Sequence, residues 1–352
     1  ILLLDDGRVE LEVNEVVGDE IRCTVIYTCE LSNNKGINLK GGGLSALALT
    51  DKDKEDLKAA TAMEVDYVAL SFARTAADVE QCRELVRAEN SDAGIVTKVE
   101  RAEAIDNIDE IIEASDVIMV ARGDLGVEMG DAELPALQKS LIKKARAMNR
   151  VVITATQMME SMIESPIPTR AEVFDVANSV LDGTDAVMLS GETAVGKYPE
   201  KTVRAMGRIC EHAEKQRAAM VSDHRLDLVF GRVDEAIAMA TMYTANHLKM
   251  KAIASMTESG ATVLWMSRIS SGIPIYALTP RLRTLSRVTL YRGVYPVRAD
   301  FTNLPAEDVT LGVVDLMKGK GIVESGDRIV LTRGDMLGDQ GGSNIMKIVT
   351  VH

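Results

Sequence analysis

The sequence is poor in aromatic residues, histidine and cysteine, and each shortage excludes a class of function. Phe, Trp and Tyr make up 3% of the 352 residues, so platforms on which nucleic-acid bases could stack are scarce. The four histidines lie isolated in the C-terminal half, which argues against a histidine-based triad or a His-rich metal site. The four cysteines match neither a zinc-binding spacing nor a disulfide framework, as is typical of the reducing cytosol.

Basic charge and long apolar runs are also lacking. The chain has 40 Lys and Arg residues against 53 Asp and Glu residues, a formal net charge of −13, whereas nucleic-acid binding favours a basic face. Apolar runs such as Val117–Val120 are strand-sized and far short of the ~18–20 residues of a membrane helix. We therefore expect neither a nucleic-acid partner nor a membrane partner. A chain of this length has room for two or three domains.

Residues 1–43 have the pattern of a small antiparallel β unit. Val9–Val13 and Ile21–Val25 alternate apolar and polar side chains, and the glycine run Gly41–Gly43 has the composition of a hinge. The chain opens on Ile1–Leu4, which is typical of the middle of a strand and has no signal-peptide pattern. We expect that an N-terminal portion precedes residue 1.

From residue 44 to about 220, apolar strands alternate with amphipathic helices. The expected strands are Tyr67–Phe72, Ile95–Val99, Val117–Val120, Val151–Thr154 and Ala186–Leu189. The expected helices are 51–64, 76–89, 102–114, 134–148, 170–181 and 199–216. This pattern predicts a parallel sheet covered by helices. A second alternation from 234 to 351 predicts a separate, smaller α/β domain, so the domain boundaries are 1–43, 44–220 and 221–352.

Polar side chains lie where the strands of the first alternation end. They are Lys98, Glu100, Asp124, Thr156 and Ser190. Catalytic residues occupy this position in a (β/α)₈ barrel, and in a doubly wound sheet at its switch point. Five strands cannot close an eight-stranded barrel. Our prediction for the fold class is therefore α/β: a parallel (β/α)₈ TIM barrel seen in part, its first strands missing, with a small β-lobe remnant and a C-terminal α/β domain.

Two carboxylates at neighbouring strand ends predict a magnesium site. Lys98 and Glu100 are two residues apart, so both side chains point to one face of their strand. Alone, this pair could be a structural salt bridge. Asp124, flanked by Gly123, adds a second carboxylate after the next strand, and Mg²⁺ favours carboxylate, water and ligand oxygens. The hydroxyls of Thr156 and Ser190 could bond a carboxylate or relay a proton, or could simply cap the following helices.

Seven segments along the chain, in this order and spacing, resemble the pyruvate kinase family, most closely in its bacterial form. They are NNKGINL (33–39), TKVER (97–101), MVARGDLGVEMG (119–130), ATQMMESMI (155–163), PTRAE (168–172), DVANSVLDG (175–183) and LSGETAVGKYP (189–199). The resemblance covers essentially the whole chain. It implies the transfer of a phosphoryl group from phosphoenolpyruvate to ADP, giving pyruvate and ATP, the last step of glycolysis.

The resemblance also implies roles for single residues of the first domain. Lys98 would neutralise the phosphoryl group in transit, where loss of the charge costs about 3–5 kcal/mol of barrier. Glu100 and Asp124 would hold Mg²⁺ or Mn²⁺. The backbone N–H groups of Gly123 and Asp124, with the Thr156 hydroxyl, would bind the substrate carboxylate.

Two further roles concern the proton and the nucleotide. Thr156 and Ser190 would belong to the water chain that protonates the enolate, which makes Lys98, Thr156 and Ser190 the catalytic residues. Lys35 would contact the nucleotide phosphates, although a lysine in a polar loop is most often solvated. The preceding segment would supply the K⁺ ligands, and the protein would be a cytoplasmic homotetramer.

In the second domain, Thr257–Thr262 lies at a junction between a strand and a helix. Hydroxyls and N–H groups at a helix start favour a phosphate, and the resemblance implies a phosphorylated effector bound by Thr257, Ser259, Gly260 and Thr262 with the glycine-rich loop 334–344. Glu258 would oppose a doubly phosphorylated sugar, so a monophosphate is the preferred ligand. An ordinary helix cap remains the alternative.

Three functions fit the sequence. The first is the phosphotransferase implied by the resemblance. The second is a barrel enzyme of the lyase type that uses the same carboxylates on an oxo-acid, which residues 1–43 argue against because it needs no nucleotide lobe. The third is a regulatory fragment with an intact effector domain and no turnover.

Overall fold

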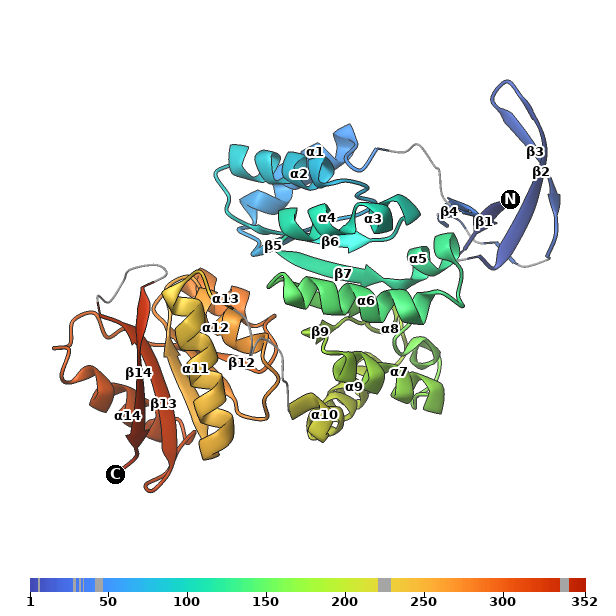
Figure 1. Ribbon diagram of the computed structural model, residues 1–352. Coiled ribbons are helices and arrows are strands. Elements are labelled where there is room, and N and C mark those ends of the chain that lie inside the picture. Colours follow the sequence, from blue (N-terminus) through green and yellow to red (C-terminus); the bar gives the residue numbers. More distant parts are fainter. Residues whose placement is uncertain are drawn as a thin grey trace. The chain divides into compact units, whose positions relative to one another are not determined.

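The computed structural model describes the chain except for positions 6, 28, 29, 32, 34, 42–46, 221–228 and 336–341. It divides into two compact units, Ile1–Met206 and Gly207–His352 (Figure 1). None of the described helices combines the length and the apolar character needed to cross a membrane. Gly42 and Gly43 of the proposed hinge Gly41–Gly43, and most of the glycine-rich loop 334–344, lie outside the described residues.

The first unit begins with an antiparallel sheet in the order β3-β2-β1-β4. Its strands are β1 (Leu2–Leu4), β2 (Val9–Val17), β3 (Glu20–Val25) and β4 (Ile37–Leu39). The hairpin between β2 and β3 turns at Gly18, whose φ of +59° is the left-handed conformation that glycine adopts without steric cost. The predicted β unit is confirmed. The fourth strand was missed, because it lies in a polar segment that has no alternating pattern.

The second sheet of this unit is parallel, in the order β5-β6-β7-β8-β9. Its strands are β5 (Tyr67–Leu70), β6 (Gly94–Val99), β7 (Val117–Ala121), β8 (Val151–Ala155) and β9 (Ala186–Val187). All five predicted strands are confirmed, and the first and last end two residues earlier than expected. Among the described residues the sheet is parallel but not closed.

Helices precede, connect and follow the parallel strands, and the six predicted helices are present, the one expected over 102–114 as two helices. They are α1 (Asp51–Ala62), α2 (Ala76–Ala88), α3 (Ala102–Asp106), α4 (Ile108–Ala114), α5 (Arg122–Met129), α6 (Leu134–Ala147), the 3₁₀ turn η1 (Glu160–Ile163), α7 (Arg170–Asp182), α8 (Gly191–Ala194) and α9 (Pro199–Glu214). Capping boxes fix three helix starts, Thr50 with Asp53, Thr75 with Asp78 and Thr169 with Glu172, because each pair satisfies backbone N–H groups that have no partner within the helix.

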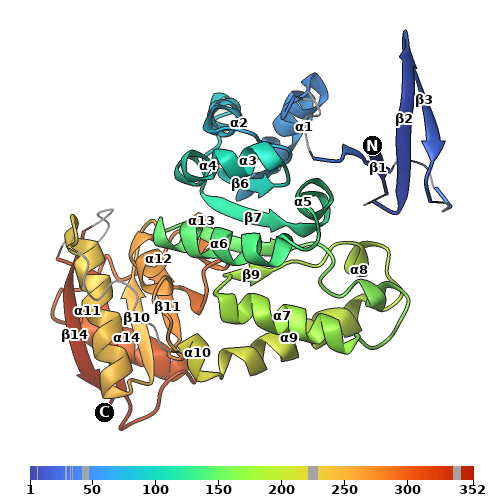
Figure 2. The same ribbon diagram turned by 45° about the vertical axis from the view of Figure 1, so that its right-hand side comes forward.

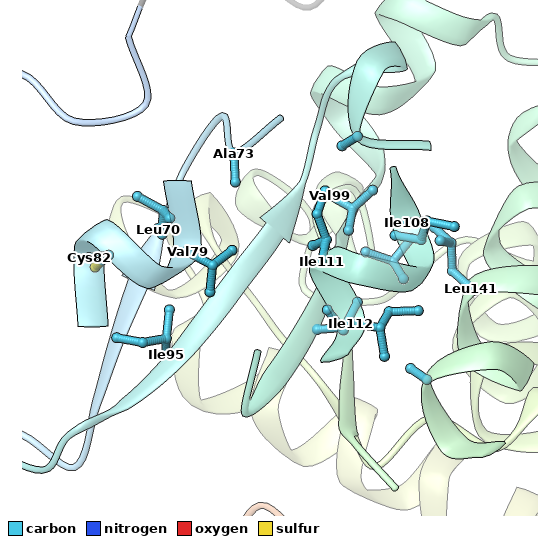
Figure 3. Close-up of a cluster of buried hydrophobic side chains, with 14 of the residues drawn as sticks. Leu70, Ala73, Val79, Cys82, Ile95, Val99, Ile108, Ile111, Ile112 and Leu141 are labelled. Carbon is cyan, nitrogen blue, oxygen red and sulfur yellow. The ribbon is translucent and has the colours of Figure 1, made fainter. Parts of the chain in front are cut away.

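The helices pack on one face of the parallel sheet through a core of aliphatic side chains (Figure 3). Val79 and Cys82 of α2 lie beside Leu70 and Ile95 in this core. Successive strand residues point to opposite faces. Lys98 therefore projects from the face of β6 opposite to that of its core-facing neighbour Val99.

The second unit contains a five-stranded sheet in the order β12-β11-β10-β13-β14, with β14 antiparallel to β13. Its strands are β10 (Ala252–Met256), β11 (Ile275–Thr279), β12 (Val294–Arg298), β13 (Arg328–Gly334) and β14 (Ser343–Thr350). Its helices are α10 (Arg217–Met220), α11 (Val233–Leu248), α12 (Ala261–Ser267), α13 (Leu282–Val288) and α14 (Val309–Gly319).

Helices cover both faces of this second sheet (Figure 2). Ile253 of β10 packs with Met242 of α11, whereas its neighbour Ala254 packs with Val313 and Met317 of α14. Alternate side chains of the strands thus pack into two separate hydrophobic cores, one on each face of the sheet. The predicted C-terminal α/β arrangement is confirmed.

Candidate active site

The polar strand ends of the first unit meet at one edge of its parallel sheet. In the sheet register Lys98 of β6 lies opposite Met119 of β7, which in turn lies opposite Ile153 of β8. Parallel strands that are aligned in this way end at the same edge, so the segments that follow them are neighbours. The candidate residues Lys98, Glu100, Gly123, Asp124 and Thr156 belong to these segments.

Lys98 is held by two polar partners on neighbouring segments. Its ammonium nitrogen Nζ lies 2.6 Å from Glu100 Oε1 and donates a hydrogen bond of 2.9 Å to Ser71 Oγ. The side chain is 25% exposed, so the charge remains accessible from the sheet edge. Ser71 was not among the predicted site residues. A hydroxyl directly after an apolar strand could have indicated it, but the predicted strand 67–72 included this residue.

Glu100 is almost completely buried, with 1% of its surface exposed. Its Oε2 accepts the backbone N–H of Phe72 at 2.9 Å, and its buried Oε1 has the Lys98 ion pair but no hydrogen-bond partner among the described residues. Burial raises the pKa of Glu100, the charge of Lys98 and the hydrogen bond from the Phe72 N–H oppose that effect, and the negative charge of Asp124 adds to it. Two carboxylates therefore lie close enough to repel each other.

Asp124 stands in the first turn of α5, where the positive end of the helix dipole favours a carboxylate. Its Oδ1 accepts a long hydrogen bond of 3.4 Å from Asn38 Nδ2 of β4. The antiparallel sheet of residues 1–43 therefore touches the candidate site within this unit. Asn38 was not predicted as a site residue, although it lies in one of the segments that carry the resemblance.

Thr156 follows β8 in a backbone conformation that is rare for its residue type. Its φ is +65°, and that of Gln157 is +54°. A threonine in the left-handed region is strained by about 1–2 kcal/mol, and such strain persists only where other contacts enforce it. The Thr156 Oγ1 accepts the backbone N–H of Gly123 at 2.8 Å, which joins the end of β8 to the start of α5.

The buried side chain of Arg122 enforces this turn, and it was not predicted as a site residue. Its guanidinium donates to the carbonyls of Ala155 and Thr156 at 3.3 and 2.7 Å, and both oxygens of Asp175 lie within 2.7 Å of its Nη1. Its position directly after a buried strand is the sequence feature that could have indicated a role at the site. Burial of its charge requires such partners.

Ser190 is the residue that precedes α8. Its backbone N–H donates to Glu192 Oε2 at 2.7 Å, and Glu192 Oε1 accepts the N–H of Met159 at 3.1 Å. Glu192 thereby connects the segment after β9 to the segment after β8. Among the described residues the Ser190 and Thr156 hydroxyls do not hydrogen-bond each other directly.

The donor set fits a hard divalent cation. No group of three or more acidic, histidine or cysteine side chains in the described part of the chain could hold a metal ion. Mg²⁺ is commonly held by only one or two carboxylates, with waters and substrate phosphates completing its shell. Glu100 and Asp124 match that pattern, and the buried Oε1 of Glu100 is an acceptor without a hydrogen bond in the described structure.

Lys35 precedes β4 and pairs with Asp5, the residue that follows β1. Its ammonium nitrogen lies 2.7 Å from Asp5 Oδ1, and the hydrogen bond and charge of Lys35 lower the pKa of Asp5. The Lys35 side chain is 39% exposed. The structure therefore leaves it within reach of solvent, two residues before the strand that carries Asn38.

The predicted effector segment forms a turn before α12. Gly260, with φ +85°, donates its N–H to Thr257 Oγ1 at 2.9 Å, and the Thr262 and Ser343 hydroxyls lie 2.7 Å apart. Ser259 Oγ accepts the N–H of Ala261 at 3.4 Å. The structure brings the four predicted residues together on one turn.

Glu258, within the same turn, is paired with a base. Its Oε2 lies 2.7 Å from Arg281 Nε, and its backbone carbonyl accepts the Thr284 hydroxyl at 2.6 Å. The side chain of Glu258 is 12% exposed, and that of Arg281 is 60% exposed. The positive charge of Arg281 therefore balances the negative charge of Glu258, which by itself would oppose a phosphate ligand.

Comparison with known proteins gives the same family over both units. Residues 1–203 match the family "Pyruvate kinase, barrel domain", and residues 235–349 match "Pyruvate kinase, alpha/beta domain". The chain is 57% identical over 357 residues to pyruvate kinase II of Salmonella typhimurium, covering all of this chain and 74% of that protein. It is 53% identical to the pyruvate kinase of Buchnera aphidicola subsp. Acyrthosiphon pisum, with the same coverage. It is 42% identical to the pyruvate kinase of Staphylococcus epidermidis, covering 99% of this chain and 60% of that protein.

Proposed function

Because the chain belongs to the pyruvate kinase family, we propose that the edge of its parallel sheet at Lys98, Glu100, Asp124 and Thr156 is the active site of a pyruvate kinase. The reaction moves the phosphoryl group of phosphoenolpyruvate to ADP and gives pyruvate and ATP. One observation carries the assignment to this edge: Glu100 is buried between the Lys98 ammonium and the Phe72 N–H, beside a second carboxylate. No observation favours the alternative function, a barrel enzyme of the lyase type, over the phosphotransferase.

Glu100 and Asp124 are the residues that would hold a divalent cation, Mg²⁺ or Mn²⁺. When bound, the cation supplies positive charge that stabilises phosphate and enolate oxygens. Lys98 adds a fixed positive charge at the same edge. Its contacts with Glu100 and Ser71 hold the ammonium in place, so little reorganisation is needed as charge develops on the transferred group.

The substrate carboxylate would lie against the start of α5. The N–H groups of Gly123 and Asp124 are in the first turn, and the helix dipole attracts an anion there. The Thr156 hydroxyl lies against the Gly123 N–H and would reorient toward the carboxylate. After the bond between phosphorus and the enolate oxygen breaks, the enolate carbon takes up a proton. Thr156 and Ser190 would guide the water that delivers it.

The architecture follows from the same family membership. The parallel sheet would be part of a (β/α)₈ barrel, and the antiparallel sheet would be part of a lid lobe from which Lys35 reaches the nucleotide phosphates. The corresponding domains are 1–43, 44–220 and 221–352. A dependence on K⁺, a homotetrameric assembly and a cytoplasmic location rest on the family alone.

The turn at Thr257–Thr262 is the proposed site of a phosphorylated effector. Thr257, Ser259, Gly260 and Thr262 bring hydroxyl and N–H groups to one turn, and Arg281 adds a positive charge beside Glu258. One acid paired with one base leaves no surplus positive charge for a second phosphate. A monophosphate is therefore the proposed ligand.

Pyruvate formation from phosphoenolpyruvate and ADP, measured with Mg²⁺ and K⁺, tests the proposed function. The Asp124→Asn variant keeps the shape of the side chain and removes its charge, so the Mg²⁺ concentration needed for half-maximal rate should rise at least tenfold. Asp131→Asn is the control, because Asp131 follows α5 on an exposed segment. Equal Mg²⁺ dependence in the two variants would contradict Asp124 as a ligand.

A further inference from the structure

A buried acid that has no role in the proposed reaction lies behind the two carboxylates. Glu128 is 7% exposed and stands on α5 four residues after Asp124, so both carboxylates lie along the same side of the helix. The Glu128 Oε2 accepts the backbone N–H of Ala102 at 2.8 Å. Ala102 begins α3 and follows Glu100 by two residues. One hydrogen bond thus joins the helix of Asp124 to the segment of Glu100.

The two helices that this hydrogen bond connects are neighbours in both views (Figures 1 and 2). The N–H of Ala102 is in the first turn of α3, where it has no partner within the helix. Arg101, the residue before α3, offers no side-chain cap of its own. Glu128 therefore provides from α5 the cap that α3 lacks.

A buried carboxylate is costly unless a positive charge accompanies it. Burial raises the pKa of Glu128, and the Ala102 N–H and the charge of Arg101 oppose that effect. Arg101 is itself 4% exposed. The charge of Arg101 therefore favours the ionised form of the buried Glu128.

Arg101 also contacts the residue that holds Glu100. Its guanidinium carbon lies 5.0 Å from the ring centroid of Phe72, within the range of a cation–π contact. Phe72 has φ +56°, a strained conformation for a bulky residue, and its N–H is the donor to Glu100 Oε2. The contact with Arg101 is one of the interactions that keep this strained turn directed at Glu100.

We propose that Glu128 and Arg101 are positioning residues that set the spacing and orientation of Glu100 relative to Asp124. This inference rests on the proposed function, in which these two carboxylates are the metal ligands. Mg²⁺ demands nearly ideal octahedral geometry, so a small change in ligand spacing weakens its binding. Partners that orient metal ligands commonly change metal affinity by about 10–100-fold when removed.

Binding of Mn²⁺ to the full chain, without phosphoenolpyruvate or ADP, tests the inference. Free Mn²⁺ is counted by electron paramagnetic resonance, and the fold of each variant is checked by circular dichroism and thermal unfolding. Glu128→Leu removes the hydrogen bond and should raise the Kd for Mn²⁺ at least tenfold. Glu128→Gln still offers an oxygen to the Ala102 N–H and should stay within about threefold of the parent chain.

Arg101→Met provides a second route to the same answer if Glu128→Leu does not fold. Loss of the guanidinium should raise the Kd for Mn²⁺ in the same direction, and Arg101→Lys, which keeps the positive charge, should recover part of the affinity. A folded Arg101→Met variant with the parent Kd would contradict the inference.

A buried acid in the other unit supplies the matched control. Asp234 is 1% exposed, stands at the start of α11 and pairs with Arg232 at 2.8 Å. Asp234→Asn should lower the unfolding temperature and leave the Kd for Mn²⁺ unchanged. A merely structural loss is thereby separated from an effect on the metal ligands.

Three further results would overturn the inference. A folded Glu128→Leu variant with the parent Kd, while Glu100→Gln weakens binding, would remove the positioning role and leave the proposed function intact. Equal losses in Glu128→Leu and Glu128→Gln would show that the charge of Glu128 matters and its hydrogen bond does not. Unchanged Mn²⁺ binding in Glu100→Gln would remove the metal site itself, and the positioning role with it.

Discussion

The backbone N–H of Gly123 donates a hydrogen bond to the side-chain oxygen of Thr156 at 2.8 Å. The two residues belong to segments that follow neighbouring strands, β7 and β8. The bond fixes the Thr156 hydroxyl at the start of α5, one residue before Asp124. A group proposed to bind the substrate carboxylate is therefore held beside a proposed metal ligand.

The Thr156 hydroxyl should matter more for turnover than for folding. We expect Thr156→Ala to lower kcat about 100-fold, because it removes a hydroxyl directed at the reacting group, and Thr156→Ser to stay within about tenfold. Steady-state assays of pyruvate formation measure both. The control is Thr154→Val, whose buried hydroxyl donates to Thr184 and so contributes to stability alone. Equal kcat values for Thr156→Ala and Thr156→Ser would contradict a role for the hydroxyl.

Arg122 should stabilise the unit through the buried contacts that shape the Thr156 turn. Arg122→Met leaves Asp175 without its cation and two backbone carbonyls without their donor, and should cost about 3 kcal/mol of unfolding free energy. Arg204→Met is the matched control, because its ion pair with Glu200 is exposed and worth under about 0.5 kcal/mol. Urea unfolding of both variants checks this. Similar losses in the two variants would contradict the anchoring role of Arg122.

The order of the elements could be predicted from the sequence because buried parallel strands are nearly continuous apolar runs. Tyr67–Leu70 and Val151–Ala155 were therefore found to within two residues. The helix expected over 102–114 is broken at Asn107, where the backbone has ψ +18°. The segment contains no proline or glycine at that position, so the break could not be predicted from the sequence.

The candidate site was predictable only where residue type and position coincide. Lys98 and Glu100 stand out because charged side chains at the end of an apolar strand are unusual. Phe72 contributes to the site through its backbone N–H, which a left-handed conformation directs at Glu100. Asn38 reaches Asp124 from a sheet that is distant in the sequence. Contributions of backbone groups, and contacts between segments that are distant in the sequence, cannot be predicted from residue type and spacing.

Two of the cysteines should react slowly with alkylating reagents in the folded protein. Burial raises the pKa of both Cys82 and Cys210 to about 11, so at pH 8 only about one thiol in a thousand is the reactive thiolate. Iodoacetamide labelling followed by peptide mass spectrometry should show both modified far more slowly than the partly exposed Cys23. Labelling of Cys82 in the native protein as fast as in urea would contradict its burial.

A sugar monophosphate should stabilise the second unit by binding at Thr257–Thr262. At 100 times its Kd, glucose 6-phosphate should add about 2.7 kcal/mol to the unfolding free energy and raise the unfolding temperature. Ser259→Asp places a negative charge on the turn and should abolish this shift. Ser286→Asp, an exposed position on α13, should not. A larger shift with a sugar bisphosphate, or an equal shift in Ser259→Asp, would contradict the proposed ligand.

The most direct test of the account compares pyruvate formation by the chain and by its Lys98→Met variant, with phosphoenolpyruvate, ADP, Mg²⁺ and K⁺ present. Lys144→Met serves as the control, because Lys144 forms an exposed ion pair with Asp109 on the helix side of the sheet. We expect turnover by the parent chain and by Lys144→Met, and a loss of about 3–5 kcal/mol of transition-state stabilisation, at least 100-fold in kcat, in Lys98→Met. Turnover by Lys98→Met at the parent rate, or a folded parent chain that forms no pyruvate, would contradict it.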